Sequence, residues 1–494
     1  MKSELERGPV VKDLLDDNGD LSMVQSARCL DPTPGTNAAC SAQAGLWNYA
    51  RHFTYNAAGA VPSMQLGNGR WESTAFNSRL QPTRIALGVT GNGAQAHDLL
   101  KLDYGYGGAN NNGNVLSQTI TVPSVTIGGT THNGFTAVQN YAYDSLNRLD
   151  DAAEYIDGSQ NPSWRQDFKY DRYGNRNFVE SNTTVVGFDK LCSNNTEVCA
   201  DLRKVLNPSA NISDNRLSSS EGYDFDPSGN TVRDPQSRRF TYDGENKQVK
   251  VETLDLNGNP VSTVGEYSYD GDGRRIKKHV PSTGEVTVFV YNASGQPVAE
   301  YSTEISKTPK VSYTTADHLG SPRILTDENG VTISRRDFHP FGEEILNAHR
   351  HMGLGYTPDD VRQKFTGYER DNESSLDFAE ARYYGYNHGR FTSPDPLMAS
   401  ARRSNPQTFN RYAYVANNPL NYIDPSGMVA CPPGEECEVI DGEEVIIDKG
   451  PPIVIESKYD PATSAPGCGG KTTGECSQYA NQPPAAALSG RRQL

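Results

Sequence analysis

The chain has 494 residues, of which 35% are hydrophobic and 22% charged, and it contains 26 Tyr, 46 Gly and 30 Pro. This profile indicates many short strands and turns, because a Tyr ring can be buried while its hydroxyl stays in water. The net charge of −15 argues against nucleic acid as a partner, and no apolar run reaches the roughly 20 residues of a membrane span.

Residues 1–45 are polar and turn-rich, with a turn predicted from Asp16 to Asp20, and carry no motif that indicates a function. The start of the chain lacks the apolar stretch of a secretory signal. Export would therefore use another route, or the chain begins inside a longer protein.

Eight cysteines fall in four close pairs, Cys29/Cys40, Cys192/Cys199, Cys431/Cys437 and Cys468/Cys476. An even number at short spacings predicts local disulfides and an oxidising compartment, with reduced thiols as the alternative. No pair has the CxxC spacing of a zinc site, and no histidine accompanies the pairs at ligand spacing.

An internal repeat begins near residue 46, an aromatic residue followed by Asp or Asn and, three residues later, by Gly or Asn. Its copies start at Tyr55, Tyr143, Tyr170, Phe225, Tyr242, Tyr269 and Tyr291, with a degenerate copy at Phe76. Residues 190–222 interrupt the series as an insertion.

Each copy predicts a β-hairpin. The Asp or Asn side chain is expected to accept hydrogen bonds from the backbone two or three residues on, and Gly or Asn supplies the positive φ that closes the turn. Val286 to Tyr291 alternates as a strand does. Because one hairpin cannot bury its own face, neighbouring copies must cover one another.

Short motifs follow between Tyr313 and Met428 in the order ADHLGSPR (316–323), FHPFGE (338–343), FTGYERD (365–371), LDFAEARYY (376–384), GRFTSPDP (389–396), NRYAYVANNP (410–419) and DPSG (424–427). With the repeats, they resemble the rearrangement-hotspot (Rhs) and YD-repeat proteins, relatives of the C component of insecticidal Tc toxins and of the teneurin shell. The resemblance covers residues 46–428.

The resemblance implies a mostly β protein. YD-repeat hairpins would form a curled or partial shell over residues 46–301, and a small mixed core domain would follow at 302–428. Residues 429–494 would be a variable tail, in which Glu438 to Ile440 and Glu444 to Ile447 predict one strand pair.

The family also implies a pair of catalytic aspartates that cleave the chain after the second of two Asp-Pro motifs. Carried onto this chain, the pair is Asp395 and Asp424, with cleavage near Gly427 and Met428. Two carboxylates in a shielded space suit this chemistry, because one stays protonated while the other activates water.

The chain departs from the self-cleaving pattern in three ways. The first motif lacks its Gly, Pro394 stands where those proteins often have Arg, and the stretch from Met398 to Gln407 lengthens the separation of the two aspartates. The alternative is that both Asp-Pro units only start turns, since Asp accepts from the backbone and Pro fixes the next φ.

Other candidate sites are weaker. The histidines His318, His339, His349 and His351 have no metal-ligand spacing, and the arginines of Arg382-Tyr383-Tyr384 and Arg411-Tyr412 predict packing against aromatic rings. No nucleophile triad or phosphate loop is present in the sequence. We therefore expect no cofactor, no metal site and, at most, autoproteolysis.

The expected function is that of a secreted or cell-surface Rhs-type protein, which holds, displays or releases its own C-terminal segment in toxin delivery or contact-dependent competition. One alternative is a structural or adhesive module that binds cell-surface carbohydrate or a partner protein. A second alternative is a self-cleaving aspartyl-type protease.

Overall fold

A computed structural model describes residues 11–16, 19–27, 46–89, 98–184, 196–292, 297–303, 312–359, 361–396, 406–433, 436–440 and 443–447. The chain divides into two compact units, 1–450 and 451–494. All described residues belong to the first unit, so the end of the predicted tail lies outside them.

The first large sheet has twelve antiparallel strands. Its order is β1 (Val11–Leu15), β2 (Leu21–Ala27), β3 (Leu46–Thr54), β4 (Ser63–Leu66), β5 (Trp71–Phe76), β6 (Pro82–Gly88), β7 (Leu100–Gly105), β8 (Ser117–Val122), β11 (Phe135–Tyr143), β12 (Leu149–Ile156), β13 (Trp164–Tyr170) and β14 (Arg176–Phe178). The hairpin of β9 (Val125–Ile127) and β10 (Thr130–His132) lies between β8 and β11 in the chain.

The second large sheet has eight strands, again in chain order. They are β15 (Asp224–Phe225), β16 (Thr231–Asp234), β17 (Arg238–Tyr242), β18 (Gln248–Leu254), β19 (Pro260–Tyr269), β20 (Arg275–Val280), β21 (Glu285–Tyr291) and β22 (Pro297–Ser302). Helix α2 (Thr196–Leu206) lies in the predicted insertion, between the two sheets in the chain.

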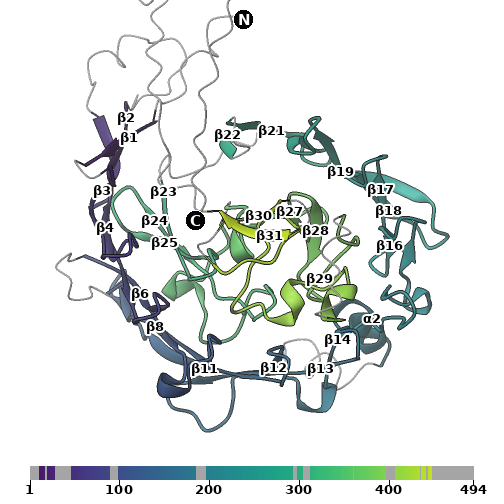
Figure 1. The fold of residues 1–494 in the computed structure, drawn as a ribbon, viewed down its shortest axis with the longest axis horizontal. Helices are drawn as coiled ribbons and strands as arrows, with labels where there is room; N and C mark the ends of the chain where they lie inside the picture. Colours follow the sequence, from purple (N-terminus) through teal and green to yellow (C-terminus); the bar gives the residue numbers. More distant parts are fainter. Residues whose placement is uncertain are drawn as a thin grey trace, which may run out of the picture. The chain divides into compact units, whose positions relative to one another are not determined.

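Smaller sheets make up the rest of the described chain. They are β23 (Ser312–Ala316), β24 (Pro322–Asp327) and β25 (Thr332–Arg335), then β26 (Glu369–Asp371), β27 (Leu376–Ala379), β28 (Arg382–Gly385) and β29 (Arg390–Phe391), and last β30 (Glu436–Ile440) with β31 (Glu443–Ile447). Within the first unit, the two large sheets follow one another around the elements β23–β29 (Figure 1). We call β1–β22 the shell and residues 312–433 the core.

The predicted mostly β fold with a partial shell is confirmed. In the described residues the strand order of each large sheet is open at both ends, so neither sheet closes into a barrel. The predicted strand from Val286 to Tyr291 is β21, and the strand pair predicted near the start of the tail is β30–β31.

The segment 1–45 has strands that the sequence did not predict. Its turn from Asp16 to Asp20 is confirmed, and β1 and β2 form a hairpin around it, with β2 also paired to β3. Asp16 accepts a hydrogen bond from the backbone N–H of Asp20, as a repeat aspartate would. The repeat therefore continues into a segment without the aromatic residue that marks it in the sequence.

The predicted repeat copies whose turn residues are described lie at hairpin turns. At Asp144 the carboxylate accepts hydrogen bonds from the N–H groups of Leu146 (2.9 Å) and Arg148 (3.0 Å). The carboxylate therefore bonds to the backbone N–H groups two and four residues on, whereas the sequence predicted two or three. The difference arises because the turn contains one more residue than a minimal hairpin. The same two bonds form at Asn56, Asn77, Asp171, Asp243, Asp255, Asp270, Asp317 and Asp327.

Several repeat tyrosines join consecutive copies. The hydroxyl of Tyr269 donates to the carbonyl of Gln248 (2.8 Å), the residue directly after the turn of the preceding copy. Tyr291 makes the equivalent bond to Arg275 (2.9 Å), and Tyr170 makes it to Leu149. In these three copies the tyrosine hydroxyl bonds to the residue after the preceding turn, although the spacing between copies varies.

The apolar core lies between the shell strands and the central elements. One buried cluster joins Leu102, Ile120 and Trp164 of the shell to Ile324 and Phe341 of the core. A second, aromatic cluster lies inside the core, and a third joins β17–β19 to β27 and β28. The shell is thus packed on the core over both large sheets.

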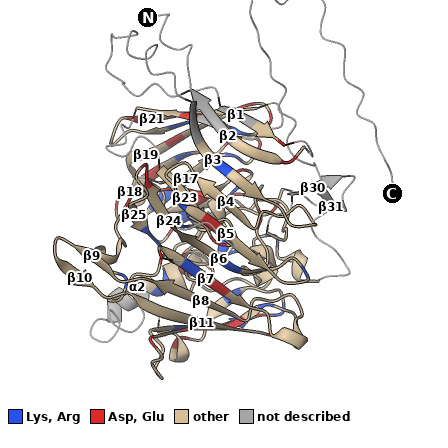
Figure 2. Cartoon of the chain, turned by 90° about the vertical axis from the view of Figure 1, so that its left-hand side faces the viewer, with Lys and Arg blue, Asp and Glu red and all other residues tan. Residues whose placement is uncertain are grey.

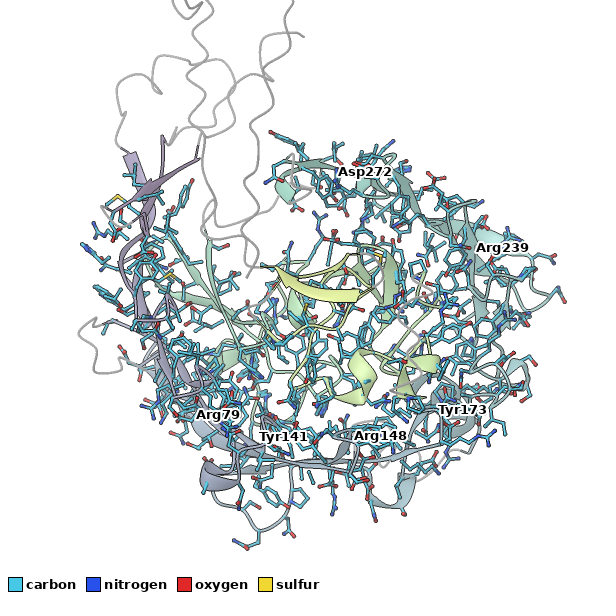
Figure 3. The ribbon with its side chains drawn as sticks, in the orientation of Figure 1. Arg79, Tyr141, Arg148, Tyr173, Arg239 and Asp272 are labelled. Atoms are coloured by element: carbon cyan, nitrogen blue, oxygen red, sulfur yellow. The ribbon has the colours of Figure 1, made fainter. Side chains whose placement is uncertain are left out.

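Charged residues of both signs are interspersed along the shell strands (Figure 2). Side chains extend from both faces of the strands, and exposed ones such as Asp272 lie at the periphery of the first unit (Figure 3). No helix among the described residues is long and apolar enough to cross a membrane.

Candidate functional site

Asp395 and Asp424 are brought together in the core. Asp395 comes shortly after β29, and its backbone N–H donates to the carbonyl of Arg411 (2.9 Å). Asp424 follows Ile423, whose backbone exchanges two hydrogen bonds with Cys431 (2.7 and 2.8 Å). Both aspartates are buried, with 5% and 3% of their surface exposed.

One guanidinium group lies beside both carboxylates. Nη2 of Arg382, the first residue of β28, is 3.0 Å from Oδ2 of Asp424 and 3.6 Å from Oδ2 of Asp395. The guanidinium also lies over the ring of Phe391, 3.6 Å from its centroid. The predicted packing of Arg382 on an aromatic ring is confirmed, but its position between the aspartates was missed.

Arg382 and Asp424 form hydrogen bonds to both polar groups of the peptide bond between Gly427 and Met428. Nε of Arg382 donates to the carbonyl oxygen of Gly427. The N–H of Met428 donates to Oδ1 of Asp424 (2.8 Å), as does the N–H of Val429 (2.9 Å). The peptide bond at which cleavage was expected is therefore the one that contacts the candidate catalytic groups.

The same contacts form a turn. Asp424 accepts through its carbonyl from the N–H of Gly427 (3.2 Å), and Ala381 donates its N–H to the carbonyl of Ser426 (3.0 Å). Gly427 has φ +69°, and a Cβ atom there would lie 2.2 Å from the carbonyl oxygen of Ala379. The turn predicted for this Asp-Pro unit is thus confirmed, and it is packed against the loop between β27 and β28.

Burial raises the pKa of Asp424, and the negative charge of Asp395 raises it further. The charge of Arg382 and the N–H groups of Val429 and Met428 act in the opposite direction, but the pKa stays above its ordinary value. A carboxyl group with a raised pKa keeps its proton to a higher pH than a free carboxyl group, which is the direction that a general acid needs.

Two departures from the self-cleaving pattern leave the site assembled. Pro394 contributes no guanidinium, yet Arg382 supplies one from β28. The stretch from Met398 to Gln407, of which residues 398–405 are outside the described residues, does not keep Asp395 from reaching the Arg382 guanidinium. The two aspartates therefore lie beside the same guanidinium although the lengthened stretch separates them in the sequence.

A hollow of about 430 Å³ adjoins the site. Arg382, Arg411, Pro396 and Met428 line it on the core side, and turn residues of the shell such as Lys247 line the other side. Met428 is 37% exposed. The hollow therefore reaches the Met428 side of the Gly427–Met428 bond.

The histidines make no metal site in the described residues, where no group of three His, Cys, Asp or Glu residues is placed to hold an ion. His318 is hydrogen-bonded through Nε2 to the carbonyl of Leu420 (2.9 Å), and His339 packs edge-on against Trp164. Burial lowers the pKa of His339 to about 3.

Cys431 is disulfide-bonded.

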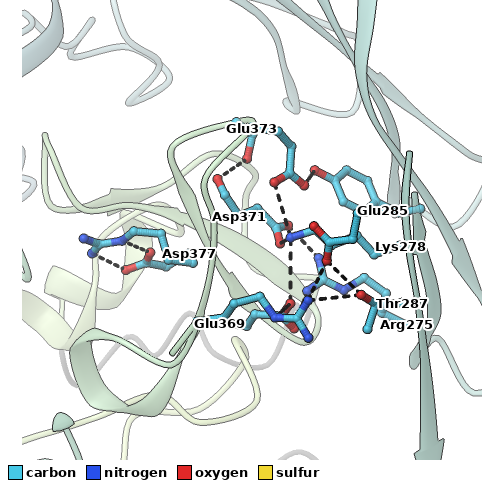
Figure 4. Close-up of polar contacts among 12 residues, drawn as sticks. Arg275, Lys278, Glu285, Thr287, Glu369, Asp371, Glu373 and Asp377 are labelled. Atoms are coloured by element: carbon cyan, nitrogen blue, oxygen red, sulfur yellow. Dashed lines mark hydrogen bonds and ion pairs between the residues drawn. The ribbon is translucent and has the colours of Figure 1, made fainter. Parts of the chain in front are cut away.

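The short basic run at 274–278 contributes to a buried ion network between shell and core (Figure 4). Arg275 is fully buried and lies 2.6 Å from both Glu369 and Asp371, and Lys278 lies 3.0 Å from Asp371. Burial alone would raise the pKa of Asp371, but the two cations hold it below its ordinary value. Arg275 and Lys278 of β20 therefore attach the shell to the core through ion pairs.

No family model matches the chain. Among characterised proteins, it is 30% identical over 271 residues to the tRNA3(Ser)-specific nuclease WapA of Bacillus spizizenii, which is 53% of this chain and 11% of that protein. It is 25% identical over 243 residues to the probable deoxyribonuclease RhsA of Dickeya dadantii, which is 42% of this chain and 16% of that protein.

Among solved structures, the Photorhabdus luminescens Tc holotoxin pore with an Asp→Ala substitution in TccC3 matches 86% of this chain and 20% of its own chain. The TM-score is 0.53 and the identity is 16%, so the likeness shows the fold. The chain spans between a tenth and a fifth of the length of these relatives.

Proposed function

This chain is an Rhs/Tc-like protein, and we propose that it holds its own C-terminal segment and releases it for toxin delivery or contact-dependent competition. The names of the relatives support a toxin-related role, since they include nucleases and Rhs proteins. In the proposal the chain acts outside the cell, as a secreted or surface protein.

The release step we propose is hydrolysis of the bond between Gly427 and Met428. Asp395 takes a proton from a water molecule, and the water oxygen attacks the carbonyl carbon of Gly427. Arg382 stabilises the negative charge that develops on the carbonyl oxygen. Asp424, protonated, gives its proton to the nitrogen of Met428 as the C–N bond breaks. The products are a carboxyl group at Gly427 and a free amine at Met428.

One observation carries the proposal. The Arg382 guanidinium contacts both aspartates and the carbonyl of Gly427, while Asp424 accepts from the N–H of Met428. If this segment only formed a turn, the contacts of Asp424 to the backbone would be sufficient. A second buried carboxylate, Asp395, beside the same guanidinium would then only cost free energy, because burying a further charge is unfavourable.

The test is the mass of the purified chain, tagged at both ends and measured under denaturing and reducing conditions. These conditions matter because Val429 and Cys431 are buried in the core and Cys431 is disulfide-bonded, so a cut tail would stay attached in the native state. We expect two fragments that meet between Gly427 and Met428.

Asp395→Asn and Asp424→Asn should each abolish the cut, and Arg382→Met should slow it. Asp327→Asn is the matched control, because the Asp327 carboxylate also accepts two backbone N–H bonds in a turn, that of the β24–β25 hairpin. A wild-type chain that stays whole after long incubation would refute the cleavage. The chain would then be better described as an uncleaved shell for display or adhesion to carbohydrate or protein surfaces.

A further inference from the structure

One turn of the shell contacts the segment of the core that carries Asp395. The turn lies between β15 and β16, and Thr231 is the first residue of β16. The N–H and the hydroxyl group of Thr231 both donate to the carbonyl oxygen of Thr392, at 2.9 and 2.7 Å. Both threonines are buried, and Thr392 comes shortly before Asp395 in the chain. The shell therefore holds the backbone just ahead of this aspartate.

A second contact from the same turn reaches the segment that pairs with Asp395. The hydroxyl of Tyr412 donates to the carbonyl of Gly229 (2.7 Å). Tyr412 follows Arg411, whose backbone carbonyl accepts from the N–H of Asp395 and whose side chain donates to the carbonyl of Asp395. A Cβ atom at Gly229, where φ is +96°, would lie 3.3 Å from Cγ of Pro394. The turn is thus packed directly against the residue before Asp395.

The turn is itself fixed by hydrogen bonds. The N–H of Asn230 donates to Oδ1 of Asp226 (2.9 Å), and its side-chain amide donates to Oδ2 (2.8 Å). The same amide nitrogen donates to Asn246 in the next turn of the shell (2.8 Å). Because the turn is bonded to its neighbour as well as within itself, it can support the core segment. Asn230 and Pro394 also line the hollow beside the cleavage site.

Thr392 connects the shell contact to the guanidinium that lies beside both aspartates. Its N–H and its hydroxyl donate to the carbonyl of Tyr383, at 2.9 and 3.2 Å, and Tyr383 follows Arg382 in β28. Thr392 is thus bonded to the shell through its carbonyl and to β28 through its two donors. Losing a bond to the shell would therefore shift Asp395 relative to Arg382, whose Nη2 lies 3.6 Å from Oδ2 of Asp395.

We propose that Thr231 of the shell is a positioning residue for the cleavage of the chain, because it holds Asp395 beside Arg382 and the Gly427–Met428 bond. Thr231 contacts none of the reacting groups and acts through Thr392. This inference rests on the proposed cleavage and deepens it, since it makes release of the C-terminal segment depend on a shell that is packed on the core.

The test compares rates of cleavage in the full chain after a short labelled pulse of cell-free synthesis, read as fragment masses under denaturing and reducing conditions. Thr231→Val keeps the shape of the side chain and the backbone N–H but loses the hydroxyl. Because a misplacement of about 1 Å can cost about 100-fold in rate, we expect this variant to cleave about 10-fold more slowly or worse. Thr231→Ser keeps the hydroxyl and should restore most of the rate.

The pH profile of the rate separates positioning from a general loss of stability. Burial and the charge of Asp395 raise the pKa of Asp424, the charge of Arg382 lowers it, and Glu380 of the β27–β28 loop also interacts electrostatically with Asp424. Cleavage that needs protonated Asp424 slows as pH rises through this pKa. When Asp395 moves away in Thr231→Val, the pKa of Asp424 falls and the slowing begins at lower pH. Thr231→Ser should keep the wild-type profile.

Tyr291→Phe is the matched control for stability. It also removes a hydroxyl that donates to a backbone carbonyl, that of Arg275 (2.9 Å), but this bond lies within the second large sheet of the shell. The variant should cleave at the wild-type rate with the wild-type pH profile. An equal slowing in Tyr291→Phe and Thr231→Val would mean that stability alone sets the rate and would overturn the inference.

Two further outcomes distinguish this inference from the cleavage on which it rests. A wild-type chain that cleaves, together with a Thr231→Val chain that cleaves equally fast with the same pH profile, would overturn the positioning role alone. A wild-type chain that stays whole would overturn the proposed cleavage and the positioning role with it.

Discussion

Arg350 of the core and Glu154 of the shell form a two-pronged ion pair in which neither side chain is exposed. The two bonds measure 2.9 and 2.7 Å, and Nε of Arg350 also lies 2.6 Å from Asp337. Glu154 and Arg350 are far apart in the sequence, so this contact ties β12 to the core. Burial would raise the pKa of Glu154, but Arg350 holds it below its ordinary value.

Arg350→Met should therefore destabilise the protein strongly. It leaves two buried carboxylates without this partner, and breaking one side of a buried ion pair costs about 3–5 kcal/mol. The double variant Arg350→Met with Glu154→Gln should cost less than the sum of the two single changes. Urea unfolding measures both, with the exposed Arg239→Met as a control expected to cost under about 1 kcal/mol. Equal costs for Arg350→Met and Arg239→Met would contradict the prediction.

The tyrosine bond between repeat copies gives a second prediction. Tyr269→Phe removes the hydroxyl that donates to the carbonyl of Gln248 and keeps the ring. Because a buried acceptor loses its partner, we expect the free energy of unfolding to fall by about 1–2 kcal/mol. Tyr173→Phe is the control, since the Tyr173 hydroxyl accepts from its exposed neighbour Arg172 instead of joining two copies. A similar loss of unfolding free energy for both variants would show that the hydrogen bond between copies stabilises the protein no more than the exposed one.

Glu343 predicts a pH dependence of stability. Burial raises its pKa from 4.5 to about 7, against the charge of Arg176 and a hydrogen bond from Gln166. Between these two pH values the folded chain keeps a proton that the unfolded chain has released. The contribution of Glu343 to stability therefore falls as pH rises through this window, and it is constant above pH 7.

Glu343→Gln removes this loss, because an amide cannot ionise and can still accept from Gln166. Relative to the wild type, the variant should gain up to about 3 kcal/mol between pH 4 and pH 8. Urea unfolding of both proteins at the two pH values checks this, and the difference at pH 4 is the internal reference. A difference between the two proteins that does not change with pH would refute the expectation.

The repeat hairpins could be predicted from the sequence because each turn is encoded locally. An Asp or Asn acceptor and a residue with positive φ lie within five positions, and the structure has these turns at Asp144, Asp243 and Asp270. At Asp16 the turn was predicted, but the strands β1 and β2 on either side of it were not, because this copy lacks the aromatic residue of the repeat.

The site was predicted in part. Asp395, Asp424 and the Gly427–Met428 bond were inferred from the family resemblance, and the structure places them together. Arg382 was assigned to packing because the aromatic residues beside it suggested that role, and nothing in its local sequence points to Asp424. Contacts such as Arg275 with Asp371 or Arg350 with Glu154 join distant segments, so only the folded chain reveals them.

The turn at Gly427 gives the last prediction. Gly427→Ala would place a Cβ atom 2.2 Å from the carbonyl oxygen of Ala379 at φ +69°, so the turn must move away from the β27–β28 loop. We expect a loss of about 2–4 kcal/mol from the clash and the backbone strain together. Gly271→Ala is the matched control, because it lies in a shell turn with open space around the added atom. Thermal unfolding compares the two variants, and equal midpoints would show that the turn is not held against the loop. Where the wild-type chain cleaves itself, Gly427→Ala should also cleave more slowly, because the carbonyl of Gly427 leaves Nε of Arg382 when the turn moves.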